Sequence, residues 1–301
     1  MCLFIKNSER GSMKTINYLN KVFTIPYLDS LFLSKELPST FNEVIDCLIK
    51  KANINGSITY EDTLKYFYKC LKNNHQNEYY YKNVLLNYLL VDTKKLNLYS
   101  AITELPIMNS KADFIVMDDK NQGTVYEIKT DLDTLQRLET QVSDYYKAFN
   151  YVYIVTGKHH VEQLENTLKD TRVGIIELTD NGEFVYKKKA LFNNKSISFD
   201  TLFHLLRKKE YESIILKYFG ELPQTTDFVY YQTCYKILET LDLDMFQKEV
   251  HTLLRKRNLI KNSDEYFKNV PKELSFYAYF SKQYRKKKID IQCLLQTKIS
   301  I

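Results

Sequence analysis

Apolar and polar residues alternate in blocks that mark three strands in the middle of the chain. Residues 112–117 and 124–129 are short apolar runs on either side of a polar turn that contains Gly123. Residues 151–156 form a third run, apolar enough for a strand buried on both faces. Runs of this length bounded by turn residues predict strands, and the first two predict a hairpin.

The segment between the second and third runs has apolar side chains at helical spacing, which predicts a long amphipathic helix. Thr130 or Asp131 is a suitable N-cap, and acidic residues crowd the first turn, where the helix dipole favours them. The apolar stripe consists of Leu132, Leu135, Leu138, Val142, Tyr145, Tyr146 and Phe149.

A helix over 78–90 and a strand over 98–107 precede the hairpin, and a helix over 160–169 and a strand over 173–178 follow the third run. The order around the hairpin is therefore helix, strand, strand, strand, helix, strand. This order predicts an α/β fold with an αβββαβ core, a mixed sheet and helices on both faces.

Helical patterns flank this region. In the lead-in, helices are predicted over 41–51 and 60–72, and Thr59 with Asp62 resembles a capping arrangement for the second. Beyond residue 189, helices are predicted over 199–207, 210–219, 230–241, 245–257 and 271–287. We expect three domains: a helical extension 1–74, an α/β domain 75–192 and a helical basic domain 193–301.

Composition narrows the class of protein. With 44% hydrophobic and 27% charged residues, the 301-residue chain can bury a sizeable core. No apolar run approaches the ~20 residues that span a bilayer, and the N-terminus lacks the apolar stretch of an export signal. Five scattered cysteines without metal-ligand spacing suggest reduced thiols, so we expect a cytoplasmic protein without membrane contact.

Three charged residues interrupt the apolar runs. Asp113 lies at the start of the first strand, and Glu127 and Lys129 lie at the end of the second. Residues two apart share a face of a strand, and hairpin pairing brings Asp113 towards the other two. Two carboxylates and an ammonium at one end of a sheet suit a divalent metal and a charge-stabilising lysine. The alternative is an exposed charge pair on an ordinary hairpin.

Arg137, Gln141 and Tyr145 follow one another at four-residue steps on the predicted helix, so they share one face. If this face turns towards the charged residues, Gln141 could bond a phosphate oxygen or the attacking water, and Arg137 could meet a phosphate. The alternative is that Tyr145 belongs to the core and that Gln141 and Arg137 are surface residues.

The entire net charge of +6 lies after residue 189. Basic clusters there alternate with tyrosines and phenylalanines, which suits phosphate contacts and base stacking. The alternative is that basic residues gather near helix C-termini, where the dipole favours them. The clusters are Arg207-Lys208-Lys209, Arg255-Lys256-Arg257 and Arg285-Lys286-Lys287-Lys288.

The spacing from Asp113 to Glu127-Ile128-Lys129, followed by Gln141 and Tyr145 on the next helix, resembles the PD-(D/E)XK nuclease superfamily. The glutamine and tyrosine resemble a motif of its RecB-like exonuclease branch. Residues 75 to 190 also look like a bacterial family of restriction-endonuclease-like proteins. The motif's proline is absent, since Ala112 precedes Asp113, as in many members of the superfamily.

The resemblance implies that Asp113 and Glu127 ligate Mg²⁺, with Mn²⁺ as a substitute, and that the main-chain oxygen of Ile128 assists. It implies that Lys129 positions the water or stabilises developing charge, and that Glu78 lies near the metal. An acidic residue in a first helical turn is equally a favourable dipole partner. Glu104, on the preceding strand, is a further candidate or a surface residue.

The sequence thus predicts a Mg²⁺-dependent nuclease that acts on nucleic acid, with DNA as the expected substrate, in phage defence or mobile-element biology. A protein partner or a homodimer is compatible with this function. The alternative is a catalytically idle or partner-activated subunit that binds nucleic acid.

Overall fold

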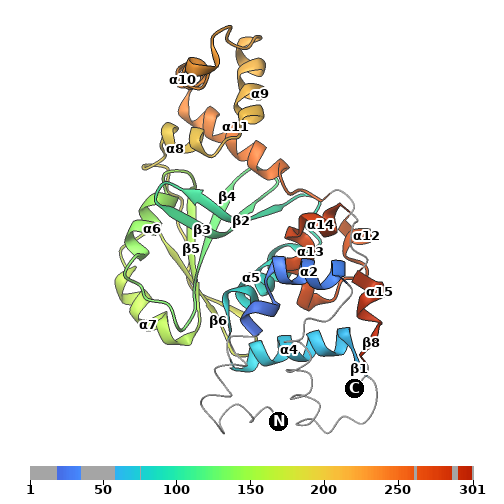
Figure 1. Ribbon diagram of the computed structural model, residues 1–301. Coiled ribbons are helices and arrows are strands. Elements are labelled where there is room, and N and C mark those ends of the chain that lie inside the picture. The colour runs from blue at the N-terminus through green and yellow to red at the C-terminus, as the bar shows by residue number, and fades with distance from the viewer. Residues whose placement is uncertain (1–18, 35–57, 75, 261–262, 287–290, 300–301) are drawn as a thin grey trace. The chain divides into compact units, whose positions relative to one another are not determined.

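The computed structural model describes residues 19–34, 58–74, 76–260, 263–286 and 291–299. The chain forms two compact units, residues 95–261 and residues 1–94 together with 262–301 (Figure 1). This grouping differs from the boundaries 1–74, 75–192 and 193–301 that we expect from the sequence. Whether those three stretches act as domains stays a prediction.

A six-stranded mixed sheet forms the centre of unit 95–261, in the order β2-β3-β4-β5-β6-β7. β2 to β4 are antiparallel, β5 and β6 continue parallel to β4, and β7 returns antiparallel. The strands are β2 (Ser100–Ile107), β3 (Ser110–Met117), β4 (Gly123–Lys129), β5 (Tyr151–Thr156), β6 (Gly174–Leu178) and β7 (Phe184–Lys188). The expected mixed α/β fold is thereby confirmed.

β7 is not predicted by the sequence pattern. It lies at the edge of the sheet, where Val185 and Tyr186 are exposed and two lysines end the strand. Its pairing with β6 is interrupted by a bulge between Ile175 and Ile176. An edge strand exposed in this way lacks the alternation that a half-buried strand shows, so only its pairing with β6 defines it.

The turn between β3 and β4 is set by local hydrogen bonds and one close contact. The side-chain Oδ1 of Asp118 accepts from the main-chain N–H groups of Lys120 and Gln122, at 2.9 and 2.7 Å. Gly123 then begins β4 against the ring of Phe149, where a Cβ atom would come within 2.4 Å of a ring carbon. The sequence signal for this turn, a glycine after a polar run, therefore has a packing reason as well.

Helices α6 (Leu138–Tyr145) and α7 (Lys158–Thr167) cover one side of the sheet (Figure 1). Their apolar side chains share a core with strand residues that alternate along β4, β5 and β6. This core includes Val125, Val152, Ile154 and Ile175 from the strands, Leu138 and Tyr145 from α6, and Leu164 from α7.

The helix predicted to start at Thr130 or Asp131 begins only at Leu138, which corrects the expected N-cap. Thr130 and Asp133 bond each other instead: the carboxylate of Asp133 accepts from the N–H and the hydroxyl of Thr130, at 2.8 and 2.7 Å. Such side-chain bonds compete with helical ones. Leu132, expected in the apolar stripe, is 75% exposed in this non-helical stretch.

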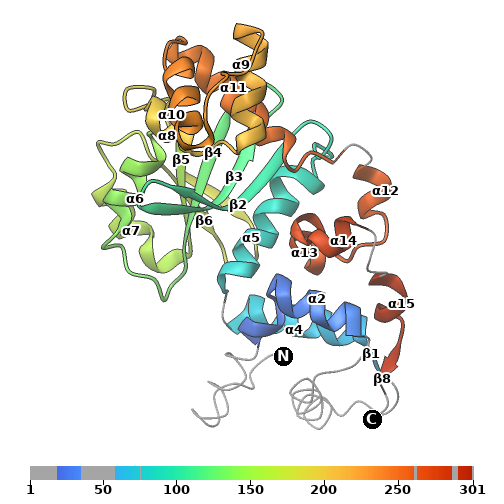
Figure 2. The ribbon, with the colours of Figure 1, turned by 45° about the horizontal axis from the view of Figure 1, so that its top comes forward.

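Four helices that follow the sheet pack within the same unit: α8 (Phe199–His204), α9 (Lys208–Phe219), α10 (Asp227–Leu238) and α11 (Leu243–Lys256). Figures 1 and 2 show them gathered at one end of the sheet. The amide of Gln247 and the ring of His251 bond the main-chain oxygen of Ala148. These helices are confirmed near the predicted positions and share the core of the sheet.

The second unit is helical, and two of its helices, α4 and α5, lie close to predicted ones. It contains α2 (Ile25–Ser34), α4 (Tyr60–Asn74), α5 (Glu78–Leu86), a π turn η1 (Asn87–Val91), α12 (Ser263–Phe267), η2 (Lys272–Leu274), α13 (Ser275–Phe280), α14 (Lys282–Arg285) and α15 (Ile291–Leu295). The strands β1 (Ile58–Thr59) and β8 (Lys298–Ile299) pair antiparallel. The helix predicted over 41–51 lies outside the described residues.

Two features of this unit bear on the sequence predictions. The capping arrangement is confirmed, because Thr59 Oγ1 accepts from the N–H of Asp62 and the carboxylate of Asp62 accepts from the N–H of Thr59, each at 3.1 Å. The single helix predicted over 271–287 is wrong. The chain turns to extended backbone at Ser281, whose hydroxyl then caps α14 by accepting from the N–H of Tyr284.

Candidate metal and catalytic site

Glu127 and Lys129 lie at the end of β4, and because they are two residues apart their side chains share one face of the sheet. β4 pairs with β3 only up to Tyr126, whereas its pairing with β5 continues to Lys129 and holds the end of the strand in place. Both residues are buried, with 1% and 7% of their surface exposed. The alternative of an exposed charge pair on an ordinary hairpin is therefore excluded for these two residues.

Asp113 lies where the β3–β4 ladder ends. Phe114 and Tyr126 are the last paired residues, and beyond them the carboxylate Oδ2 of Asp113 accepts from the N–H of Ile128, at 2.8 Å. The main-chain oxygen of Asp113 accepts from the hydroxyl of Thr103 on β2, at 2.8 Å. The Asp113 side chain thus takes the place of the next backbone hydrogen bond between the strands, and this bond holds its carboxylate beside the end of β4.

α6 turns Gln141 and Tyr145 towards Glu127. Glu127 Oε1 accepts from the ammonium of Lys129 at 2.8 Å and from the amide of Gln141 at 2.5 Å, and Oε2 accepts from the hydroxyl of Tyr145 at 2.6 Å. Lys129 also donates to Gln141 Oε1, at 2.9 Å. We call these four side chains the Glu127 network.

The Glu127 network accounts for most of the accepting capacity of its carboxylate. A carboxylate has about four lone-pair sites, and three are occupied here. Charge-assisted bonds of this kind compensate the cost of burying an ionised group. No fourth donor among the described residues bonds this carboxylate, so one accepting direction on Oε2 is left for a further partner.

Tyr145 acts as a donor in this network because its hydroxyl holds its proton. Burial, and then the negative charge of Glu127, raise the pKa of Tyr145 far above its usual value. The ring is fully buried and the hydroxyl also lies 3.1 Å from the main-chain oxygen of Lys111. Of the two possibilities left open by the sequence, a core position is the one observed, with the hydroxyl turned to Glu127.

Glu104 on β2 joins Asp113 at the edge of the site. β2 and β3 pair regularly on both sides of Glu104, but Glu104 itself has a positive φ of 56°, which marks a local irregularity in the strand. A carboxylate oxygen of Glu104 lies within 4.8 Å of one of Asp113. Lys111 forms an ion pair with Glu104. The β2–β3 ladder skips this position, which no sequence signal marks.

Glu78 belongs to the other unit. It lies in the first turn of α5, which Asn77 caps by accepting from the N–H of Tyr80 at 3.0 Å. Its carboxylate forms an ion pair with Lys82, one turn later. Both readings of Glu78, dipole partner and metal ligand, stay predictions.

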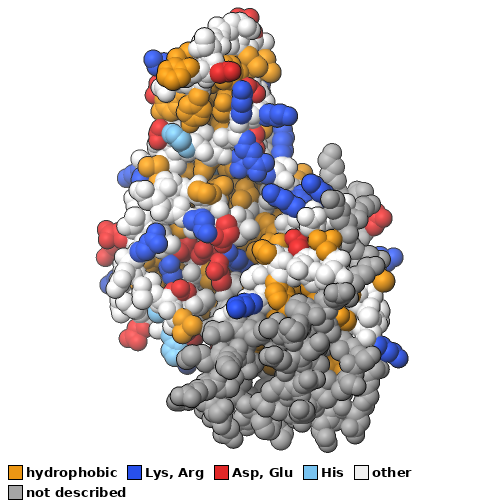
Figure 3. All heavy atoms as spheres, viewed as in Figure 1, with side chains coloured by type: hydrophobic (Ala, Val, Ile, Leu, Met, Phe, Trp, Pro, Cys, Tyr) orange, Lys and Arg blue, Asp and Glu red, His pale blue; other side chains and the backbone are white. Residues whose placement is uncertain are grey.

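The basic residues expected to bind nucleic acid divide into two groups. Arg137, Arg207, Lys208, Lys209 and Lys256 are exposed. Lys208 lies over the ring of Tyr230, 4.8 Å from its centroid. Figure 3 shows Lys and Arg side chains gathered over α9 and α11, and acidic side chains over β2 to β4.

The two arginines of the second cluster hold the structure together. Arg257 donates to Glu210 Oε1 and to the main-chain oxygen of Leu205, both at 2.7 Å. Arg255 donates to the main-chain oxygen of Asp119 at 3.2 Å and to Asn121 Oδ1 at 3.0 Å. Their contacts favour a structural role over phosphate binding. Lys287 and Lys288 lie outside the described residues.

The geometry of the site does not assign the chain to a protein family, but comparison with known families does. Residues 71–291 match the model of a family described as bacteriophage P4 protein cII. The match covers most of the chain, including β3 and β4 of the site, α6 and the helices up to α14. The chain belongs to the bacteriophage P4 protein cII family. No curated protein matches it in sequence.

Two solved structures resemble parts of this member of the bacteriophage P4 protein cII family. SPO1766, a protein of unknown function from Silicibacter pomeroyi, has a TM-score of 0.28 at 12% identity, over 43% of this chain and 85% of its own. SfsA of Pyrococcus furiosus in complex with Ca²⁺ has a TM-score of 0.24 at 14% identity, over 37% and 61%. The family assignment therefore rests on the sequence match.

Within the ranges that the structure describes, none of the helices has both the length and the apolarity that crossing a bilayer requires.

Proposed function

We propose that this protein hydrolyses phosphodiester bonds of nucleic acid, with DNA as the expected substrate, at a metal-dependent site of PD-(D/E)XK type. The observation that carries the proposal is the Glu127 network, in which a glutamate, a lysine and a glutamine from β4 and α6 are in direct contact inside the molecule. The order α5, β2, β3, β4, α6, β5 along the chain supports an αβββαβ core.

Lys129 supplies positive charge without being a metal ligand. Its ammonium is held by Glu127 and Gln141, so its position is fixed before a substrate arrives. Hydrolysis concentrates negative charge on the phosphoryl oxygens, and a pre-positioned cation stabilises that charge at little reorganisation cost. Gln141 holds the lysine and the glutamate in register, and its own contacts make it a positioning residue.

The donor chemistry near β4 fits Mg²⁺. Glu104 and Asp113 bring carboxylate oxygens within 4.8 Å of each other, and Glu127 has one accepting direction left. Hard carboxylate oxygens are the ligands that Mg²⁺ and Mn²⁺ prefer. We propose Asp113 and Glu127 as ligands, with the main-chain oxygen of Ile128, Glu104 and Glu78 as further candidates. The ion, when bound, supplies a Lewis acid and an activated water.

The exposed basic side chains would hold the nucleic acid backbone. Arg137 lies at the N-cap of α6, and Arg207, Lys208, Lys209 and Lys256 lie on the helices beyond the sheet. Each phosphate neutralised by such a side chain adds affinity that salt weakens. A phage-related family suits a role in phage defence or mobile-element biology.

A second candidate function is binding without cleavage, or cleavage only within a complex. It is favoured by one observation: the carboxylate of Glu127 is already bonded by three donors of its own chain. A site closed in this way could remain inactive until a partner displaces one donor.

Cleavage assays decide between the two. Labelled linear and circular DNA, single- and double-stranded, and RNA are incubated with Mg²⁺, Mn²⁺ or EDTA. We expect metal-dependent cutting by the wild type and a loss of about 10²–10³-fold in Lys129→Met. Glu127→Gln and Asp113→Asn should abolish cutting.

Lys120→Met is the matched control, because Lys120 also follows an acidic residue two positions earlier but is exposed in the β3–β4 turn. It should cut like the wild type. Salt-sensitive binding without cutting, equal in wild type and all variants, would exclude a stand-alone nuclease and support the second candidate.

A further inference from the structure

A buried carboxylate that the proposed chemistry does not use fastens α6 to the start of β3. Asp144, in the last turn of α6, is 3% exposed, and its Oδ2 accepts from the hydroxyl of Ser110 at 2.8 Å. Its Oδ1 accepts from the ammonium of Lys147 at 2.9 Å. Burial alone would raise the pKa of Asp144, but the bonds from Lys147 and Ser110 outweigh burial and hold that pKa below its usual range. Asp144 is therefore an ionised acceptor.

This contact lies where β3 and β4 separate. Their ladder ends at Phe114 and Tyr126, so residues 110–113 of β3 lie beyond it. On the other side, Glu127 and the residues after it continue β4 through their pairing with β5. A gap thus opens between the two strand ends, with Asp113 on the β3 side and Glu127 on the β4 side.

The last turn of α6 bridges this gap through two successive residues. Asp144 bonds Ser110, at the start of β3. The hydroxyl of Tyr145 bonds Glu127 Oε2 at 2.6 Å on β4, and it lies 3.1 Å from the main-chain oxygen of Lys111 on β3. We call these contacts of Asp144 and Tyr145 the α6 brace. Two of its bonds are accepted by buried carboxylates, and such charge-assisted bonds are stronger than neutral ones.

We propose that Asp144 is a positioning residue that sets which divalent cation the site prefers. Through Ser110 it fixes the start of β3, and therefore how far Asp113 lies from Glu127. This inference rests on the proposed function. Mg²⁺ requires near-octahedral oxygen ligands at about 2.0–2.1 Å, whereas Ca²⁺ accepts irregular geometry at about 2.3–2.6 Å. A gap that is free to widen loses the geometry that Mg²⁺ needs and still satisfies Ca²⁺.

Displacement of Mn²⁺, followed by its electron paramagnetic resonance signal, tests this proposal on the full chain, with Mg²⁺ and Ca²⁺ as separate competitors. The wild type should bind Mg²⁺ more tightly than Ca²⁺. Ser110→Ala, which removes the donor, should weaken Mg²⁺ binding about tenfold and change Ca²⁺ binding by less than about twofold. Asp144→Asn should change the ratio of the two affinities in the same direction. A merely structural loss would weaken both ions alike.

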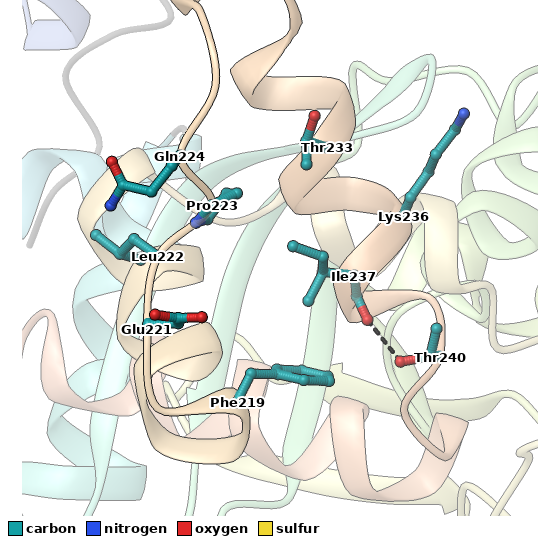
Figure 4. A pocket seen from close by; sticks show the side chains of 9 residues that line it. All are labelled: Phe219, Glu221, Leu222, Pro223, Gln224, Thr233, Lys236, Ile237 and Thr240. Carbon is teal, nitrogen blue, oxygen red and sulfur yellow. Dashed lines mark hydrogen bonds between the residues drawn. The ribbon is translucent and has the colours of Figure 1, made fainter.

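Two variants of the same unit are matched controls. Glu249→Gln changes a carboxylate that also accepts from a lysine and a hydroxyl, those of Lys217 at 2.7 Å and Tyr218 at 2.9 Å. Thr240→Val removes a hydroxyl that donates to the main-chain oxygen of Ile237 at 2.7 Å, beside the pocket between the 219–224 segment and α10 (Figure 4). Both should keep the wild-type ratio, and melting temperatures should show that every variant is folded.

The outcomes separate this inference from the proposed function. An unchanged ratio in Ser110→Ala and Asp144→Asn, or an equal loss of both ions, would overturn the positioning role while Mg²⁺ binding by the wild type still supports the site. A wild type that binds Ca²⁺ as tightly as Mg²⁺ would also overturn it. Binding of neither ion by the wild type would overturn the metal site and this inference together.

Discussion

At the scale of single residues, the decisive arrangement is an ionised glutamate in the interior. Glu127 is 1% exposed, and its burial is tolerated because Lys129, Gln141 and Tyr145 all donate to it. Removing any one donor leaves a buried charge with less compensation. Stability and the proposed chemistry therefore depend on the same three bonds.

Two adjacent tyrosines allow a matched test of one bond. Tyr145→Phe removes the hydroxyl that donates to Glu127 Oε2, so we expect the free energy of unfolding to fall by about 1–3 kcal/mol. Tyr146→Phe removes a buried hydroxyl that has no hydrogen-bond partner among the described residues, so it should be neutral or stabilising. Urea unfolding of both variants measures the difference. Equal losses would show that the Tyr145 bond contributes nothing specific.

At the scale of elements, the site depends on how strands end and how helices begin. β3 and β4 separate after Phe114 and Tyr126, which lets Asp113 bond the main chain of β4. α6 begins late, at Leu138, so Gln141 lies in its first turns and faces β4. The turn between β3 and β4 is in turn covered by α11, through His251.

Gly123 fixes the start of β4 through its contact with Phe149. A methyl group at Gly123 would meet the ring at 2.4 Å, so Gly123→Ala should cost about 1–3 kcal/mol of the free energy of unfolding. Phe149→Leu, combined with Gly123→Ala, should recover part of this loss, since the shorter side chain leaves space. A double-mutant cycle measured by urea unfolding detects the coupling. Additive losses would contradict the steric explanation.

His251 should make the stability of the sheet and its covering helix depend on pH. Burial lowers the pKa of His251, and its contacts with the main-chain oxygens of Ala148 and Asn121 and the charge of Asp118 oppose this only in part. Below about pH 6.5 the unfolded chain binds a proton more readily than the folded one. The free energy of unfolding should therefore fall as pH drops below that value.

Urea unfolding at pH 7.5 and 5.5 measures this effect. His251→Phe keeps a ring beside Phe149, on which His251 is stacked, and lacks the titrating group. It should be less stable than the wild type at pH 7.5, with a smaller further loss at pH 5.5. The same loss in wild type and variant would assign the pH dependence to other groups.

At the scale of the whole molecule, charge and apolar surface are unevenly distributed. Basic clusters lie near the start of α9 and the end of α11. Neighbouring basic residues nevertheless differ in role: the exposed ones are free to meet a partner, whereas the less exposed ones bond other parts of the chain.

Variants of Arg257 and Lys256 distinguish a structural role from a role in DNA binding. Arg257→Ala removes one partner of a mostly buried pair with Glu210, so it should lower the free energy of unfolding by about 2–3 kcal/mol. Lys256→Ala should leave stability unchanged and should weaken DNA binding, with the slope of log K against log salt reduced by about 1. Unfolding curves and anisotropy titrations at several salt concentrations measure both. DNA binding unaffected by Lys256→Ala would remove that lysine from the proposed surface.

The sequence by itself determined the positions of β2 to β6, of α7 and of α8 to α11, because alternation and helical spacing are local properties. It also determined which residues of β4 share a face, since the strand period is two. Residue spacing, together with the family resemblance, thus brought Glu127, Lys129 and Gln141 into one hypothesis.

Only the tertiary structure decided what these residues touch. The edge strand β7 and the irregularity at Glu104 depend on strand pairing, which no local pattern encodes. The late start of α6 and the break at Ser281 go with side-chain bonds of Thr130 and Ser281 to residues three positions along the chain, which the apolar spacing did not reveal. Burial likewise distinguished Arg257 from Lys256. Contacts between residues far apart in the chain decide burial, so sequence period can place a side chain on a face but not say what that face meets.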